Sequence, residues 1–181
     1  MSQQTPSAFS GFPTLLMQEF EEVEELLSVD RGGYLLAEGE VEQYLYLLQS
    51  GAVRIFLNTD GEEQTIRFGY TGSVINSLSS FLTGKPSEFF IEAVRKSTFK
   101  RLPKERLELL IGHQPLAYAR FMEQVLVQQV ERELDLLTAS PAHRLQRVLD
   151  RSPNLFQEIP LKYIASYLRM TAETLSRVRN P

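Results

Sequence analysis

The chain has 181 residues, of which 43% are hydrophobic and 23% charged, a composition typical of a soluble globular protein with one large domain or two small ones. It contains no cysteine and only two histidines, which argues against disulfides, iron–sulfur clusters, zinc sites and a histidine-based catalytic triad. Residues 141–181 carry seven basic and three acidic side chains, a net charge of +4, whereas residues 1–140 carry 12 basic and 20 acidic ones. A basic end on an acidic body favours contact with a polyanion, although a solvated basic face without a partner gives the same pattern.

The first residues, MSQQTPSAFSGFP, have no basic flank and no apolar core, so they do not resemble a signal peptide. No apolar run approaches the length of a membrane span. We therefore expect residues 1–13 to form a flexible polar tail and the protein to be cytoplasmic, without a membrane partner. No nucleophile–base pair and no metal-ligating cluster can be assembled from the sequence, so we expect no enzyme, no metal and no cofactor.

Residues 14–28, TLLMQEFEEVEELLS, are predicted to form an acidic amphipathic helix, because their apolar side chains recur at three- and four-residue steps. Between about 31 and 102 the pattern changes to short apolar or alternating runs broken by turn residues. Asp60-Gly61 lies between two such runs and favours a tight hairpin. Several short strands of this kind predict an antiparallel roll or barrel. The expected fold class is α+β, with a jelly-roll-like β-roll flanked by helices.

A helix over 103–114 and a long helix over about 116–137 are predicted next. The long helix carries an apolar stripe made of Ala119, Met122, Leu126, Val130, Leu134 and Leu137. Such a stripe usually packs on its own domain. Here the helix separates two units of different composition, which favours pairing with a second copy as a short coiled coil. We predict a homodimer with Met122, Leu126, Val130 and Leu134 at its interface.

The C-terminal segment has the apolar spacing of a helix-turn-helix. A helix over 140–151 begins at the N-cap Ser140, and a further helix follows with its apolar residues on one face. Residues 169–171 are left for the turn before a last helix that Thr171 would cap. Arg169 occupies a turn position where glycine is common, because the backbone there tends toward positive φ; a side chain costs about 1 kcal/mol there.

The last helix is predicted to bury Leu175 and Val178, and its polar side presents Ala172, Glu173, Ser176 and Arg177 outward. An arginine there can bind guanine through two hydrogen bonds, and a glutamate can accept one from the cytosine amino group. This pattern indicates a recognition helix in the major groove of DNA. An ordinary pair of packed helices is the alternative interpretation.

The chain from about 14 to 180 resembles the CRP/FNR family of bacterial transcription regulators, since ETLSR at 173–177 matches the family's E-x-x-S-R signature. The stretch IPLKYIASYLRMTAETLSRVR looks especially like the short-tailed members of Bacteroidetes-type bacteria. The resemblance implies a cyclic-nucleotide-binding-like effector domain at 14–114, a dimerisation helix at 115–138 and a DNA-binding domain at 139–181. It also implies a palindromic operator and RNA polymerase as a candidate partner. The DNA contacts that we expect are Lys162, Thr171, Ala172, Glu173, Ser176, Arg177 and Arg179.

The expected effector pocket departs from the family. Asn76 and Ser77 stand where cyclic-nucleotide binders carry Gly-Glu, and Ser87 and Glu88 stand where they carry Arg-Ser. The carboxylate for the ribose and the guanidinium for the phosphate are therefore missing. Lys85 supplies a positive charge but not the guanidinium fork. We expect no tight binding of cyclic AMP, and these five residues mark a pocket for an unknown effector.

Two functions follow from these observations. The first is a homodimeric DNA-binding regulator with an altered effector pocket. The second is a ligand-sensing or protein-interaction module whose C-terminal helices only pack. The cluster of Glu173, Ser176 and Arg177 favours the first function, because helices that only pack on the domain do not require these side chains on their exposed face.

Overall fold

Eight short strands form the centre of the protein in the computed structural model, which describes residues 11–179. They are β1 Leu27–Val29, β2 Tyr34–Leu36, β3 Tyr44–Ser50, β4 Ala52–Thr59, β5 Glu62–Tyr70, β6 Val74–Ile75, β7 Phe90–Ala93 and β8 Ser97–Pro103. One sheet has the order β1-β8-β3-β6 and the other β2-β7-β4-β5, and neighbouring strands are antiparallel in both. The predicted antiparallel roll is confirmed.

The β4–β5 hairpin forms at the predicted turn. Asp60 and Gly61 connect the strands with φ angles of 54° and 84°, and positive φ at both positions is what a type I′ turn requires. The strands stay paired from Thr59–Glu62 to Ala52–Tyr70, with one register shift after Ile55. Because β5 is an edge strand of its sheet, its outer side can contact another element.

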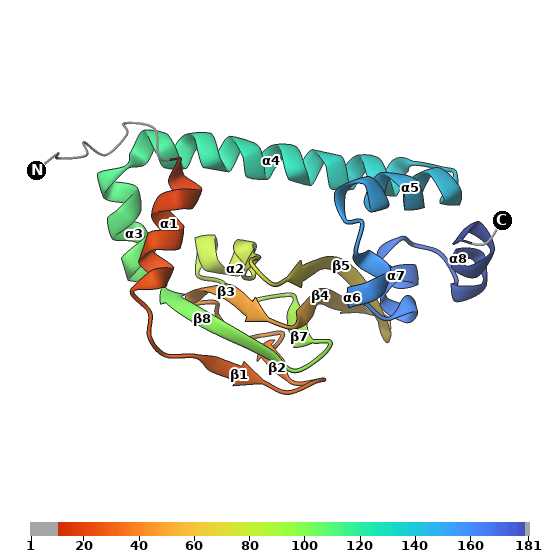
Figure 1. Ribbon diagram of the computed structural model, residues 1–181, viewed down its shortest axis with the longest axis horizontal. Coiled ribbons are helices and arrows are strands. Elements are labelled where there is room, and N and C mark those ends of the chain that lie inside the picture. The colour runs from red at the N-terminus through yellow and green to blue at the C-terminus, as the bar shows by residue number, and fades with distance from the viewer. Residues whose placement is uncertain (1–10, 180–181) are drawn as a thin grey trace, which may run out of the picture.

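The helices are α1 Phe12–Glu21, α2 Leu78–Thr83, α3 Lys104–His113, α4 Pro115–Leu137, α5 Pro141–Arg151, α6 Leu155–Glu158, α7 Leu161–Tyr167 and α8 Ala172–Arg179. Figure 1 shows α1 and α3 at one end of the molecule and α5 to α8 at the other, with α4 running above the roll between them. Ser140 caps α5 as predicted, its hydroxyl accepting from His143 N. None of the helices within residues 11–179 is long and apolar enough to cross a membrane.

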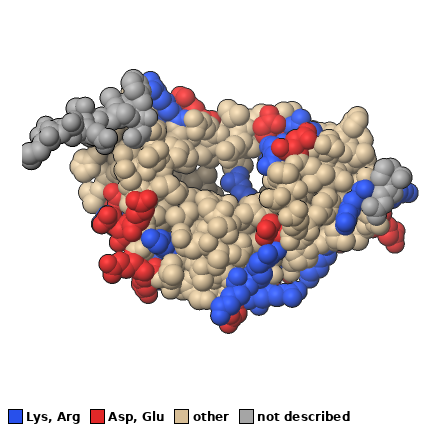
Figure 2. Space-filling model, viewed as in Figure 1, with Lys and Arg blue, Asp and Glu red and all other residues tan. Residues whose placement is uncertain are grey.

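The first helix differs from the prediction of a helix over 14–28. It ends at Glu21, and Leu27 pairs with Phe99 in the β1–β8 ladder instead. Four glutamates between 21 and 25 explain the early end, because negative charge at a helix C-terminus opposes the helix dipole. Figure 2 shows acidic side chains gathered at this end of the molecule.

The start of α1 also lies earlier than predicted. Phe12 is its first residue and is buried, so the helix begins inside the segment 1–13 for which we predicted a tail. Residues 1–10 of that segment lie outside the described residues. Helices α2 and α6 were not predicted, since each is short and carries no repeated apolar spacing.

Three hydrophobic clusters hold the elements together. One lies inside the roll and centres on strands β3, β4 and β7. A second joins α1 and α3 to the roll through side chains such as Phe12, Phe20 and Leu102. The third unites the C-terminal helices with Ala52 and Val94 of the roll. The C-terminal helices therefore share a hydrophobic core with the roll.

One face of α4 is apolar and uncovered in the single chain. Leu126, Val130 and Leu134 are 61%, 53% and 44% exposed. Asp135 is the one residue of the helix that is classed as buried. These three side chains form an exposed apolar stripe along the helix.

Candidate nucleic-acid interface

Helices α7 and α8 and the turn between them form a helix-turn-helix. Arg169 has φ of 53°, so the positive φ expected at this turn position is confirmed. Thr171 caps α8, since its hydroxyl oxygen accepts a hydrogen bond from Thr174 N at 3.1 Å. The turn therefore sets the direction of α8 through a strained backbone position and a side-chain cap.

Helix α8 packs through its apolar face. Leu175 is 1% exposed and lies in the cluster that contains Ile164, Ala165 and Leu168 of the preceding helix and turn. Val178 packs against the same cluster, and α8 contacts both α5 and α7. With this face buried, the opposite face of α8 is directed outward.

The seven residues that we predicted to contact DNA are all exposed, namely Lys162, Thr171, Ala172, Glu173, Ser176, Arg177 and Arg179. Two of the cations lie on aromatic rings of the same chain. The Arg179 guanidinium lies 4.8 Å from the centroid of the Phe156 ring, and Lys162 Nζ lies 4.5 Å from that of Tyr163. Arg179 is thus directed toward α6, whereas Glu173, Ser176 and Arg177 carry the outward polar face of α8.

A shallow groove separates the β4–β5 hairpin from the start of α8. Glu62, Glu63 and Gln64 line one side, and the other side includes Lys162 and Thr171. Arg169 bridges the groove by donating a hydrogen bond to the side-chain oxygen of Gln64. Glu62 and Glu63 make the hairpin side of this groove acidic, and Glu63 is paired with Arg54.

Helix α7 is attached to the roll by contacts that the sequence did not reveal. Ser166 Oγ accepts from Thr65 N at 3.0 Å and donates to Glu63 O at 2.9 Å. The rings of Phe68 and Tyr167 lie 5.0 Å apart. These contacts position the helix-turn-helix against strand β5.

A buried arginine supports the same junction. Arg54 on β4 is 2% exposed and donates hydrogen bonds to Glu92 and Glu63, each at 2.6 Å. Its guanidinium also lies 3.9 Å from the centroid of the Tyr163 ring on α7. Two carboxylates and an aromatic face stabilise this buried charge. Arg54 thus links the sheet that contains β4 to the C-terminal helices.

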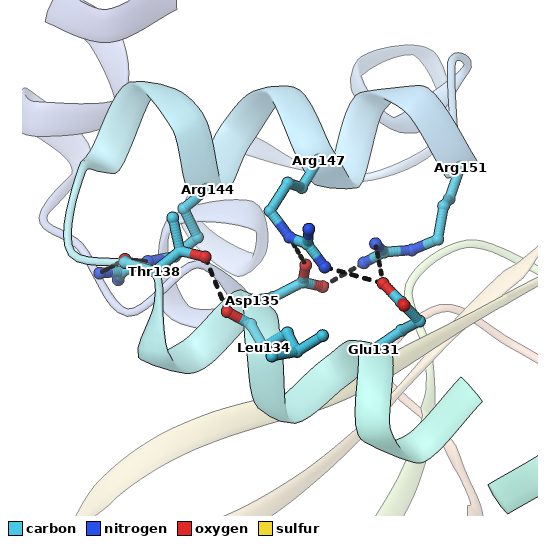
Figure 3. A network of polar contacts seen from close by, with 7 residues as sticks. All are labelled: Glu131, Leu134, Asp135, Thr138, Arg144, Arg147 and Arg151. Atoms are coloured by element: carbon cyan, nitrogen blue, oxygen red, sulfur yellow. Dashed lines mark hydrogen bonds and ion pairs between the residues drawn. The ribbon is translucent and has the colours of Figure 1, made fainter. Parts of the chain in front are cut away.

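The junction between α4 and α5 is held by a network of ion pairs (Figure 3). Asp135, which is fully buried, accepts a hydrogen bond from Arg147 Nε at 2.9 Å and another from Arg151. Glu131, one turn earlier on α4, accepts from Arg147 at 2.7 Å. The hydrogen bond to Asp135 raises the pKa of Arg147. The network fixes α5 on α4 and so determines where the helix-turn-helix lies.

The five residues predicted for the effector pocket do not converge. Ser77 and Ser87 are buried and hydrogen-bonded to each other, with 2.8 Å between their hydroxyl oxygens. Lys85 and Glu88 are exposed. Asn76 lines a cavity of about 280 Å³ that the roll, α1 and α4 enclose. The structure thus brings only one of the five residues to this cavity.

A buried carboxylate beside this region was missed in the sequence. Glu42 is 1% exposed and accepts hydrogen bonds from Tyr44 N at 3.1 Å and Ser77 N at 3.2 Å. Burial raises the pKa of Glu42, and burial together with the Glu42 charge raises the pKa of Tyr46. Nothing in the spacing around Glu42 distinguishes it from the exposed glutamates nearby. Among residues 11–179 no group of three or more His, Asp or Glu side chains could hold a metal ion.

The roll, the long helix and the helix-turn-helix together form the CRP/FNR fold. Residues 26–114 match the model of the family described as Cyclic nucleotide-binding domain. The solved structure of FixK2 from Bradyrhizobium japonicum superposes with a TM-score of 0.71 at 23% identity, covering 86% of this chain and 82% of that one. This likeness defines the fold.

Curated relatives fall into two kinds. Nitrogen fixation regulation protein FixK of Rhizobium meliloti (strain 1021) is 28% identical over 152 residues, which cover 81% of this chain and 70% of FixK. Neuropathy target esterase sws of Drosophila ananassae is 25% identical over 158 residues, which cover 83% of this chain. The chain spans only 9% of the length of that esterase.

Proposed function

We propose that the chain is a DNA-binding transcription regulator that acts as a homodimer on a palindromic operator. The observation that carries this proposal is the exposed row of Glu173, Ser176 and Arg177 on a helix whose opposite face is anchored by Leu175. A short helix after a tight turn, with such side chains outward, suits insertion into the major groove. The likeness to FixK, which is named as a regulation protein, supports the same conclusion.

Dimerisation is proposed through α4. Its stripe of Leu126, Val130 and Leu134 is exposed in the single chain, and the helix is 23 residues long. A parallel pair of such helices would bury the stripe and place the two copies of α8 at one end of the dimer. The two-fold symmetry of this dimer requires operator half-sites whose centres are about one helical turn of DNA apart, roughly 34 Å. RNA polymerase is the further partner that we propose at the promoter.

The effector pocket is proposed to be altered so that it does not bind cyclic AMP tightly. Ser77 and Ser87 stand in the sequence where the carboxylate and the guanidinium are expected, and one hydrogen bond joins their hydroxyl groups. An anionic cyclic phosphate would find no guanidinium at these positions. We also propose that the chain belongs to the Bacteroidetes-type branch of the family, on the stretch 159–179.

The test is enrichment of bound duplexes from a random pool, followed by fluorescence anisotropy on the enriched site over a range of salt concentrations. A regulator should enrich a palindrome, and the logarithm of its association constant should fall linearly with the logarithm of salt concentration. Failure to enrich any sequence, with no retention on duplex DNA at low salt, would favour the alternative, a sensing or protein-interaction module whose C-terminal helices only pack.

A further inference from the structure

The cavity between the roll and α4 has a cationic side chain in its lining. Arg67 lies on β5 opposite Ile55, is half-buried and lines the cavity. Within residues 11–179 its guanidinium forms no hydrogen bond and no ion pair, and burial lowers the pKa of Arg67. A half-buried guanidinium with no carboxylate beside it in the described part of the chain is a favourable partner for an anion that enters the cavity.

A second polar group in the cavity is also unsatisfied. The Nδ2 atom of Asn76 is buried and has no hydrogen-bond acceptor in the described part of the chain. Arg67 and Asn76 therefore present donors without acceptors to the same space. Buried donors without partners are rare in native proteins, and an ordered water or a ligand oxygen atom completes such a group.

The rest of the lining is mostly apolar. Phe12 packs against Tyr118 and Phe121, with ring centroids 5.2 and 5.5 Å apart, and these rings line one part of the cavity. Leu16 and Phe81 extend the apolar surface. Figure 2 shows that the molecule is hollowed between α4 and the roll, where basic atoms are visible.

We infer that this cavity binds a small amphipathic carboxylate, whose head pairs with Arg67 and Asn76 and whose apolar chain lies against the aromatic side chains. A carboxylate matches the planar guanidinium with two parallel hydrogen bonds and leaves an acceptor for the amide. The cavity of about 280 Å³ suits a medium-length chain. Such a carboxylate would be the ligand of the altered effector pocket, and its role in regulation rests on the proposed function. Its binding can be measured independently of DNA recognition.

Calorimetric titration of the full chain with decanoate tests this inference, with decanol and cyclic AMP as comparison ligands. We expect decanoate to bind at least about tenfold more tightly than decanol, which has the same chain without the charge. Cyclic AMP should not displace it. Equal affinity for the acid and the alcohol, or no binding of decanoate, would overturn the inference.

Matched variants locate the head group. Arg67→Met should remove the preference for decanoate over decanol, and Arg67→Lys should retain part of it because the charge remains. Arg31→Met, which alters an exposed arginine away from the cavity, should leave both affinities unchanged. Unchanged decanoate affinity in Arg67→Met contradicts the assignment even if the wild type binds.

The two proposals fail in different ways. Arg67-dependent binding of decanoate in a chain that enriches no DNA sequence supports the cavity and rejects the regulator. Sequence-specific DNA binding in a chain that does not bind decanoate rejects the cavity ligand and leaves the regulator supported.

Discussion

The backbone N–H of Thr65 on strand β5 donates a hydrogen bond of 3.0 Å to the hydroxyl of Ser166 on helix α7. The same hydroxyl donates to Glu63 O at 2.9 Å, so one side chain satisfies a donor and an acceptor of the edge strand. Unpaired edge groups invite water or another strand. Helix α7 therefore protects the outer side of β5, and its own position depends on this contact.

Replacing Ser166 with alanine should loosen α7 from β5. Loss of the hydroxyl leaves the N–H of the fully buried Thr65 unpaired, at a cost of about 1–3 kcal/mol. We expect faster hydrogen exchange at the Thr65 amide and a lower unfolding temperature. Ser28→Ala, which alters an exposed serine on β1, is the control. Unchanged exchange at Thr65 would show that packing alone holds α7.

Asp135 is expected to be essential for the angle between α4 and α5. It is fully buried and accepts hydrogen bonds from Arg147 and Arg151, and Asp135→Asn removes the charge that holds both. Loss of these two charge-assisted hydrogen bonds at a fully buried position should lower the unfolding temperature by about 4 °C or more in a chain of this size. Asp150→Asn, on the exposed side of α5, should change it little. Equal shifts in the two variants would contradict the structural role of the network.

Stability should depend on pH through Glu42. Burial raises the pKa of Glu42 above its ordinary value of 4.5, so the folded state binds this proton more tightly than the unfolded state does. The contribution of Glu42 to the free energy of unfolding is therefore fully present below pH 4.5 and is lost as pH rises through the raised pKa. Denaturant titrations should show the stability of the wild type relative to Glu42→Gln declining over this window. The exposed Glu38→Gln should show no such trend, and a wild-type advantage that grows with pH would contradict this prediction.

Local signals in the sequence predicted most of the fold. Asp60-Gly61 specified a tight hairpin turn, the three- and four-residue apolar spacing specified α4, and the N-cap Ser140 with Pro141 specified α5, both with nearly the observed bounds. Thr171 predicted the start of α8 because N-caps act within one turn. The error at α1 has a local cause too, since the glutamates after residue 20 satisfy helix propensity but oppose the helix dipole.

Contacts between distant segments could not be predicted from such signals. Ser166 and Thr65 are 101 positions apart, and neither residue type differs from its neighbours in a way that marks a pair. Arg67 and Asn76 share a cavity because α1 and α4 close over the roll, which no periodicity encodes. The outward face of α8 was predictable because one buried leucine, Leu175, fixes it, whereas the pocket depends on the packing of several elements.

The apolar stripe of α4 should hold two chains together. Val130 is 53% exposed in the single chain, and Val130→Glu would bury an unpaired charge at the proposed seam. Sedimentation should find the wild type dimeric at micromolar concentration and the variant monomeric. Leu109→Glu is a matched control, because Leu109 is 62% exposed but lies on α3. A monomeric wild type, or equal dissociation in both variants, would contradict dimerisation through α4.

Arg177 and Arg179 should act differently on DNA although only one residue separates them. Arg177 lies four residues after Glu173, so the two share a helix face, whereas Arg179 is turned by roughly 200° from Arg177. The position of the Arg179 guanidinium, 4.8 Å from the Phe156 ring centroid, agrees with this geometry. Arg177 is therefore placed to read a base, and Arg179 at most to contact phosphate.

Substitution of each arginine by alanine separates these roles. Arg177→Ala should weaken binding to the enriched site by about 1–3 kcal/mol and relax preference at one base pair of each half-site, because a bidentate contact to guanine is lost. Arg179→Ala should weaken all duplexes about equally and reduce the salt slope by about 1 per subunit if it contacts a phosphate. Anisotropy on the enriched site and its single-base variants measures both effects. If Arg177→Ala weakens every variant by the same factor, Arg177 does not read a base, and α8 contributes only general electrostatic attraction to DNA.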